Sequence, residues 1–345
     1  MTEARKDPLD FNFGLAFEPA TQRLAGEKVE RTELGMRALP YNHAFLDDYL
    51  RCIMPNDLVL LGAETGAGKT ELARWIAASN AIAGKRVYYF ALEAEPREIE
   101  RRTKYSILAD LVFQHRIRIP GGLNYIDWYR GVLERYLHEV DAEADRIFAE
   151  KYKTLFTYYR GSSFSHEHIR KLLLAYQDQA DLFILDHLHY VDIEDENENR
   201  GFKLLVKTIR DISIAIGRPV ILVAHLRKSD RRQKQIVPHR EDFHGSSDII
   251  KIATDIILIA PALAQPSSRD GIANTFFSVQ KAREAGATRL VALSEFDRRT
   301  RRYASHYTLG YETKPGEWEP LGTAEVPSWA HRHEPLSVPM IQGAP

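Results

Sequence analysis

The sequence contains few of the features that mark extracellular or membrane proteins. Its only cysteine is Cys52, which excludes a disulfide framework and a zinc site built from cysteines. No run of about 18 apolar residues is present that could cross a bilayer, and the first residues are charged, unlike a signal peptide. Neither charge dominates, since 47 Lys and Arg face 48 Asp and Glu. We therefore expect a cytoplasmic protein without a membrane partner, in which any nucleic-acid contact comes from a local basic patch.

Hydrophobic residues make up 44% of the 345 residues and charged residues 28%, enough for a large core under a solvated surface. Short apolar runs alternate with amphipathic segments, notably 70–83, 96–115 and 200–216. The runs lie at 58–61, 87–92, 182–185, 220–224, 255–260, 275–279 and 289–293. This alternation predicts an α/β fold with a mostly parallel central sheet flanked by helices.

The remaining segments predict three further parts of the chain. Residues 1–40 have scattered aromatic side chains and read as an arm with one short helix, which either is a flexible tail or docks on a neighbouring subunit. Residues 105–160 are rich in Tyr, Arg and Leu and predict a helical insertion at one edge of the sheet, centred on 105–150. The last 35 residues hold six of the sixteen prolines, so we expect 311–345 to be an irregular tail after a folded domain over 41–310.

Residues 58–70 read as an apolar strand, a glycine-rich loop and the start of an amphipathic helix. This order is typical of a loop that binds the phosphates of ATP through backbone N–H groups at a helix N-terminus. Lys69 would reach the β- and γ-phosphates, and the Thr70 hydroxyl would bind Mg²⁺. The first glycine of the usual pattern is replaced by an alanine. The predicted nucleotide-binding residues are Ala63, Glu64, Thr65, Gly66, Ala67, Gly68, Lys69 and Thr70.

Two carboxylates follow predicted strands and suit the chemistry of hydrolysis. Asp186 ends the run 182–185 and is expected to orient Mg²⁺ beside the loop, although a turn-capping role is the alternative. The next residue is His187 and not a carboxylate, so the general base must come from elsewhere. Glu93, after the run 87–92, is the candidate that would polarise the attacking water. Glu95 and Glu98 fit better as acids favoured near a helix start, a role that is also open for Glu93.

With these motifs in place, the sequence resembles the RecA-type motor domain of the DnaB family of replicative hexameric helicases. The resemblance spans about residues 40–310. It rests on the lead-in to the loop, the strand that ends in Glu93, the Asp-aromatic-Leu-Gln signature, the strand that ends in the γ-phosphate sensor, and a Lys-x-Arg-x-x-Gly element. These lie at 45–58, 90–94, 185–189, 217–227 and 280–286.

The resemblance implies roles for three more residues. The sensor position, usually Gln, is His225 here; a buried structural histidine is the alternative. Arg283 would be a finger, and Lys281 its helper, inserted into the ATP site of an adjacent subunit; an ordinary solvated hairpin is the alternative. A finger acting in trans implies a homo-oligomer, a hexameric ring in this family, with ATP bound at the subunit interface.

A basic stretch follows the sensor strand, at the position where the family's loop grips single-stranded DNA in the central channel. Lys and Arg suit this task because neutralising phosphates supplies sequence-independent affinity; an inert surface loop is the alternative. An acidic stretch, 192–198, stands where a second DNA-facing loop might be expected. The predicted DNA-binding residues are Arg227, Lys228, Arg231, Arg232 and Lys234.

We therefore expect a Mg²⁺-dependent ATPase that forms a ring and couples hydrolysis to translocation on, or unwinding of, DNA, as in DNA replication. We expect no counterpart, in this sequence, of the N-terminal helical domain with which replicative members recruit primase. Loading would then depend on the 1–40 arm or on a partner protein. Two alternatives stay open: a nucleotide-switched scaffold that recruits proteins, and a small-molecule kinase, which would have no use for a Lys-x-Arg pair.

Overall fold

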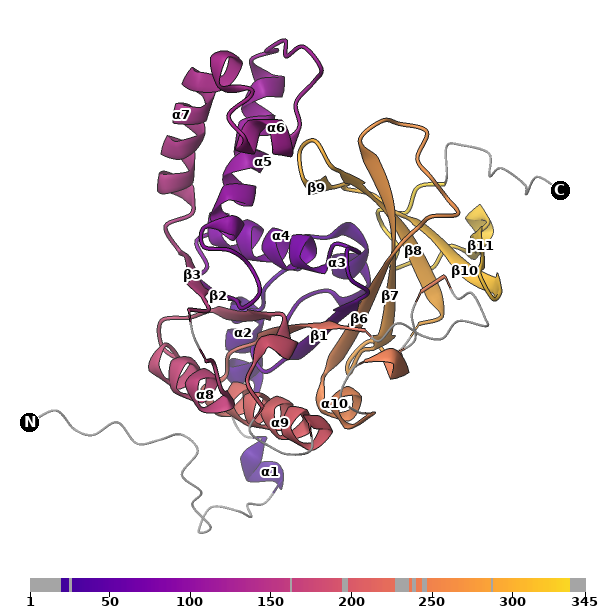
Figure 1. Ribbon diagram of the computed structural model, residues 1–345. Helices are drawn as coiled ribbons and strands as arrows, with labels where there is room; N and C mark the ends of the chain where they lie inside the picture. Colours follow the sequence, from indigo (N-terminus) through magenta and orange to yellow (C-terminus); the bar gives the residue numbers. More distant parts are fainter. Residues whose placement is uncertain are drawn as a thin grey trace, which may run out of the picture.

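The computed structural model describes residues 20–24, 27–161, 163–193, 198–226, 236–237, 240–243, 247–286 and 288–335. These residues form an 11-stranded sheet with helices on both faces (Figure 1). The strand order is β11-β10-β8-β7-β6-β1-β5-β4-β2-β3, and β9 pairs with β8. Within the described part of the predicted arm lie two helices, α1 (Ala20–Arg23) and α2 (Glu27–Arg37), where we expected one. Among the helices described, none combines the length and apolarity needed to cross a bilayer.

The parallel half of the sheet confirms the predicted α/β architecture. Every residue of the central strands β1 and β4 is buried, which is why these strands read as continuous apolar runs. β3 is the edge strand and alternates between half-buried and exposed positions, so it went unrecognised within the segment predicted to be helical. The six strands are β1 (Leu58–Ala63), β2 (Val87–Ala91), β3 (Leu155–Tyr159), β4 (Leu182–Asp186), β5 (Val220–His225) and β6 (Asp255–Pro261).

Helices cover the two faces of this half because side chains alternate along each strand. Val59 and Leu61 of β1 pack in the same cluster as α3 and α4, whereas Leu58 and Leu60 pack with α8, α9 and α10 on the other face. The two layers are visible above and below the sheet in Figure 1. The helices are α3 (Ala44–Leu50), α4 (Lys69–Ile82), α8 (His166–Ala175), α9 (Glu198–Ile216) and α10 (Ser247–Ile252).

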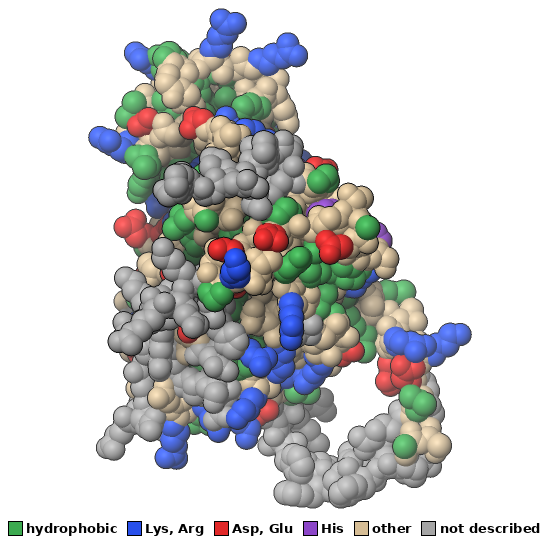
Figure 2. Space-filling model, turned by 90° about the vertical axis from the view of Figure 1, so that its right-hand side faces the viewer, with side chains coloured by type: hydrophobic (Ala, Val, Ile, Leu, Met, Phe, Trp, Pro, Cys, Tyr) green, Lys and Arg blue, Asp and Glu red, His purple; other side chains and the backbone are tan. Residues whose placement is uncertain are grey.

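The predicted helical insertion is present as α5 (Glu98–Gln114), α6 (Tyr125–Tyr129) and α7 (Glu134–Lys151). These helices bury an apolar cluster of their own and stand out from the body of the molecule (Figure 1). Lys and Arg side chains gather at the end of this projection (Figure 2). Arg116, Arg118 and Arg130, in the segments between its helices, are exposed.

The antiparallel half corrects our expectation of an irregular segment from residue 311, because 311–320 completes a hairpin of the sheet. Trp318 fixes this hairpin: its side chain is 2% exposed, and its indole N–H donates to the carbonyl of Val291 at 3.2 Å. Gly310 leaves room for the ring, since a Cβ atom there would lie 2.4 Å from it. The strands are β7 (Ile272–Lys281), β8 (Leu290–Asp297), β9 (Arg302–Tyr303), β10 (Thr308–Lys314) and β11 (Glu317–Pro320). Residues 336–345 of the predicted tail lie outside the described residues.

The proline count misled because Pro315 lies in the β10–β11 turn and Pro320 ends β11, where neither disrupts a strand interior.

Replacing Trp318 with alanine should lower the free energy of unfolding by about 3–5 kcal/mol, because a large buried side chain is lost and a cavity remains. Urea unfolding of purified protein measures this change. Glu319→Ala is the matched control: Glu319 is the next residue and is exposed, so its loss should change stability by about 0.5 kcal/mol or less. Equal, small effects of both substitutions would contradict a docked hairpin.

Candidate functional site

The phosphate loop connects β1 to α4 at the edge of the sheet where the parallel strands end. Gly66 and Gly68 have φ values of 80° and 94°, in the left-handed region that favours glycine. The loop therefore turns tightly and directs the first N–H groups of α4 toward the space above the strand ends. A cavity of about 500 Å³ opens there, and the predicted loop residues that line it are Thr65, Gly66, Gly68, Lys69 and Thr70.

The other predicted loop residues, Ala63, Glu64 and Ala67, do not line this cavity. Ala63 is the last residue of β1, fully buried, and needs no positive φ, so alanine is tolerated where the usual pattern has glycine. A neighbouring side chain approaches the backbone one residue earlier, at Gly62. A Cβ atom on Gly62 would lie 2.3 Å from the ring of Phe243, so glycine is required there.

Oxygen atoms from two strands and from the first turn of α4 meet beside the cavity, which Thr70 lines. The Thr70 hydroxyl donates to Oδ1 of Asp186 at 3.4 Å, and Tyr89 of β2 donates its hydroxyl to Oδ2 of Asp186 at 2.7 Å. Asp186 ends β4 and is 1% exposed. The structure thus brings Thr70 and Asp186 together as expected, and hydroxyl and carboxylate oxygens are the donors that Mg²⁺ prefers. Tyr89, which orients Asp186, was missed because a tyrosine within an apolar strand gives no sign of its partner.

Glu93 lies two residues beyond β2 and lines the same cavity. Its Oε2 atom pairs with Nε2 of His187, the residue that follows Asp186. Nδ1 of His187 lies 3.1 Å from Oδ1 of Asp186. The His187 ring is therefore held between the candidate base and the candidate Mg²⁺ ligand. We had not counted His187 among the site residues, although its place directly after Asp186 was a usable signal.

The neighbouring acids differ from Glu93 in their surroundings. Glu98 lies in the first turn of α5, pairs with Arg102 and accepts a hydrogen bond from the backbone N–H of Glu95 at 3.1 Å. Glu98 therefore supports the start of the helix, as predicted. The Glu95 side chain is 77% exposed and lies 3.8 Å from Arg101.

His225 ends β5 and pairs with Ala63 of β1, so its side chain reaches the phosphate loop. Its Nδ1 atom lies 3.0 Å from Nζ of Lys69 and 3.4 Å from Oγ1 of Thr65. Burial and the nearby positive charge of Lys69 lower the pKa of His225 and favour the neutral ring. Burial also lowers the pKa of Lys69, an effect that the charges of Asp186 and Glu93 oppose. The structure thus places the predicted sensor beside the predicted phosphate-binding lysine.

A buried acid that the sequence did not single out lies at the wall of the same cavity. Glu71 of α4 is 8% exposed. Three arginines surround it: Arg74 at 3.1 Å, Arg102 at 2.8 Å, and Arg301 from the β8–β9 turn. Burial opposes ionisation of Glu71, but the three positive charges outweigh it and lower the pKa from 4.5 to about 2. Glu71 therefore stays charged and ties the start of α4 to α5 and to the antiparallel half of the sheet.

Arg283 and Lys281 lie at the opposite end of the strands from the cavity. Lys281 pairs with Ile256 near the start of β6, whereas the loop follows residues that pair with the far end of that strand. Nζ of Lys281 donates to the backbone carbonyls of Ile250, Lys251 and Ala253 at 2.6–2.9 Å, at the end of α10. The structure therefore does not bring these two residues together with the chain's own phosphate loop.

Arg283 lines a second cavity, of about 840 Å³, near the start of β1 and β6. Its backbone N–H donates to Oδ1 of Asp255 at 3.3 Å. Burial, together with the charge of nearby Asp57, raises the pKa of Asp255 to about 6. At this end of the sheet, the carboxyl groups of Asp57 and Asp255 therefore lie close to Arg283.

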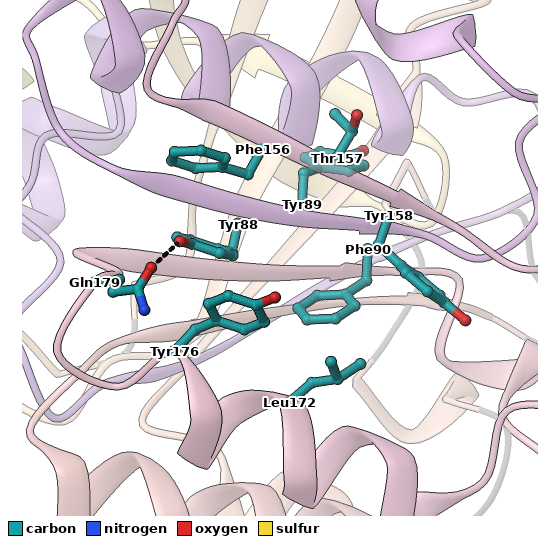
Figure 3. Close-up of a pocket in the computed structure, with 9 residues that line it drawn as sticks. All are labelled: Tyr88, Tyr89, Phe90, Phe156, Thr157, Tyr158, Leu172, Tyr176 and Gln179. Carbon is teal, nitrogen blue, oxygen red and sulfur yellow. Dashed lines mark hydrogen bonds between the residues drawn. The ribbon is translucent and has the colours of Figure 1, made fainter.

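A third cavity, of about 430 Å³, lies between β2, the edge strand β3 and α8 (Figure 3). Its lining is mainly aromatic, and the hydrogen bond drawn in it joins the Tyr88 hydroxyl to Oε1 of Gln179 at 3.3 Å. It has no cluster of charged side chains and lies on the sheet face away from α4. Its apolar lining residues include Tyr88, Phe90, Phe156, Tyr158, Leu172 and Tyr176.

The predicted DNA-binding residues Arg227, Lys228, Arg231, Arg232 and Lys234 lie outside the described residues. So does most of the acidic stretch, 194–197. At its described start, Asp192 pairs with Arg160 at 2.7 Å and accepts a hydrogen bond from the backbone N–H of Phe164. The charge of Asp192 is therefore compensated within the fold.

Comparison with known proteins agrees with this arrangement. Residues 38–305 match the family model of the "DnaB-like helicase C terminal domain". A solved ATPase domain aligns with a TM-score of 0.64 and 14% identity, covering 84% of this chain and 99% of that one. "The Structure Of A DnaB-Like Replicative Helicase And Its Interactions With Primase" aligns with a TM-score of 0.61 and 14% identity, covering 84% and 67%. At this identity the two structures show a shared fold alone. No curated protein matches the chain.

Replacing Glu71 with glutamine should reduce stability at neutral pH, and the difference from wild type should shrink as the medium becomes acidic. The pKa of Glu71 is lowered from 4.5 to about 2, so its stabilisation is complete above pH 4.5 and is lost as the pH falls through about 2. That difference in pKa corresponds to about 3 kcal/mol. Denaturant unfolding of both proteins from about pH 7 to about pH 3 measures the difference. Stability curves that stay parallel over this range would show that Glu71 is not held as a buried anion.

Proposed function

The chain belongs to the family of DnaB-like helicase C-terminal domains, and from this premise we propose that it is a Mg²⁺-dependent, ring-forming ATPase that moves along or unwinds single-stranded DNA. One observation carries the proposal. Lys69 and Thr70 of α4, Glu93 and His225 line one cavity above the strand ends, and Asp186 lies beside it in contact with Thr70. This is the set of groups that binding, positioning and hydrolysing a nucleoside triphosphate requires.

In the proposed reaction, the loop N–H groups and Lys69 hold the β- and γ-phosphates of ATP. Thr70 and Asp186 would hold Mg²⁺, which offsets the charge of the phosphate oxygens. The Glu93 carboxylate faces the same cavity and orients the attacking water. Its contact with His187 restricts the direction in which the carboxylate points.

His225 is suited to report on the γ-phosphate. It lies 3.0 Å from Lys69, so a phosphate bound by Lys69 would lie within reach of the imidazole. The basic loop begins two residues later, at Arg227. We propose that loss of the γ-phosphate moves the end of β5 and, with it, the grip of this loop on DNA.

The position of Arg283 supports assembly with other copies. It lies at the far end of the strands from its own phosphate loop, so it can act on ATP only in an adjacent subunit. An arginine from a neighbour neutralises charge on the transferring phosphoryl group, and a repeated head-to-tail contact closes into a ring, which we propose is a hexamer. Lys281 would have to leave three carbonyls to act there, so the trans role falls first to Arg283.

ATP hydrolysis measured with and without single-stranded DNA tests the proposal. We expect DNA to stimulate the wild-type protein and the combined variant Arg231→Ala, Arg232→Ala, Lys234→Ala to lose this stimulation, because it lacks positive charges that neutralise phosphates. Glu93→Gln should hydrolyse ATP about 10²- to 10⁴-fold more slowly in both conditions.

The matched control, Arg130→Ala, Arg135→Ala, Lys153→Ala, removes three exposed positive charges from the helical projection and from the segment between α7 and β3. It should respond to DNA as wild type does. Hydrolysis by wild type with no response to DNA, in an assembly that depends on nucleotide, would instead favour the scaffold alternative.

Mixing two inactive variants tests whether Arg283 acts in trans. Lys69→Ala cannot bind phosphate normally and Arg283→Ala cannot assist its neighbour, so each alone should lose hydrolysis. In an equal mixture about a quarter of the interfaces join an intact Lys69 to an intact Arg283, and activity should return in proportion. A mixture that remains as inactive as its components would contradict a role in trans.

A further inference from the structure

Glu93, His187 and His225 bring a carboxylate and two imidazoles to one side of the phosphate cavity. One ligand atom from each lies within 4.8 Å of the others. Nε2 of His225 lies 3.8 Å from Oε2 of Glu93, and Nε2 of His187 contacts that same oxygen. Hydrolysis of ATP needs the base and the sensor, but it does not require a second imidazole directed at the base. The pairing therefore calls for a separate explanation.

The surroundings of His187 are those of a metal ligand. Its Nδ1 atom lies 3.1 Å from the carboxylate of Asp186, so an N–H on Nδ1 is held by Asp186 and Nε2 is left to face Glu93. Metal-bound histidines usually donate their second ring nitrogen to a carboxylate in this way, which fixes the ring and strengthens the ligand. The backbone of His187 has φ 70°, a left-handed bend at the end of β4 that is uncommon for a histidine.

His225 offers the second imidazole. Its ring centroid lies 4.9 Å from that of His187. Its Nδ1 atom lies 3.0 Å from Nζ of Lys69. Because an ammonium can only donate, Lys69 has to withdraw when Nε2 binds the ion and Nδ1 carries the ring proton. The ring is 23% exposed at the cavity wall, so an ion has a path from solvent.

We propose that Glu93, His187 and His225 form a binding site for one divalent transition-metal ion of the Zn²⁺ type, separate from the Mg²⁺ ligands Thr70 and Asp186. Two histidines and one glutamate with a fourth, open position are a donor set that Zn²⁺ takes in proteins, whereas Mg²⁺ prefers oxygen alone. Zinc bonds of about 2.1 Å place tetrahedral ligand atoms about 3.4 Å apart. The 3.8 Å between His225 and Glu93 is close to this spacing, whereas His187 and Glu93 are in direct contact and have to separate to admit the ion.

This site would regulate hydrolysis, an inference that rests on the proposed function. The ion takes the Glu93 oxygen that would orient water and the His225 nitrogen that would face the γ-phosphate. It replaces the proton between Nε2 of His187 and Glu93, and that proton passes to solvent. Zn²⁺ and hydrolysis therefore exclude one another at this site.

The test uses the full chain without a histidine tag and without nucleotide. Calorimetric titration with Zn²⁺ should give one ion per chain, and Co²⁺ should give the visible absorption of a four-coordinate ion. Glu93→Gln, His187→Gln and His225→Gln should each weaken binding by on the order of 100-fold. Circular dichroism confirms that each variant is folded, and three separate ligand variants guard against the failure of one.

His138→Gln is the matched control, because His138 is 82% exposed on α7 and pairs with Glu134; it should bind Zn²⁺ as wild type does. Absence of Zn²⁺ binding, or binding that none of the three ligand variants weakens, would overturn the inference. The metal titration needs no ATP, so its result is independent of the proposed function. ATP hydrolysis by a protein that fails to bind Zn²⁺ would overturn only this inference. Zn²⁺ binding at these residues without ATP hydrolysis would overturn the proposed ATPase function and the regulatory role with it, but not the metal site.

Discussion

The buried carboxylate of Glu71 joins the three parts of this fold. It belongs to the helix that begins at the phosphate loop, and its arginine partners come from that helix, from α5 of the helical projection and from the β8–β9 turn. A buried charge is tolerated only when its partners stay in place. The position of the phosphate loop therefore depends on both the projection and the antiparallel half of the sheet.

The sequence predicted the parts of the site that local pattern determines. The buried strands read as apolar runs, and the ends of parallel strands meet at one edge, so Asp186 and Glu93 were expected near Lys69 and Thr70. The family resemblance added His225. The predicted roles of these residues remain proposals, but the structure places their side chains in or beside one cavity. The substitution at Ala63 proved harmless because that residue still belongs to β1.

What the sequence did not reveal depends on contacts between distant segments. The β10–β11 hairpin is part of the fold because Trp318 inserts beside Gly310 and Val291, and a count of prolines cannot show this. Glu71 was not singled out, because its partner Arg301 lies 230 positions away in the sequence. Lys281 illustrates the same limit, since its binding to the end of α10 is set by strand register and not by its motif.

The edge of the sheet formed by β11 is poorly suited to pairing with another strand. β11 has four residues, its exposed positions are Glu317 and Glu319, and it ends at Pro320, which has no N–H to donate. Short edge strands with like charges and a terminal proline resist the addition of a strand from another molecule. The hairpin that closes the antiparallel half thus also protects the protein from edge-to-edge aggregation. Self-association through the β11 edge is therefore disfavoured. Contacts between copies of the chain then have to form through other surfaces.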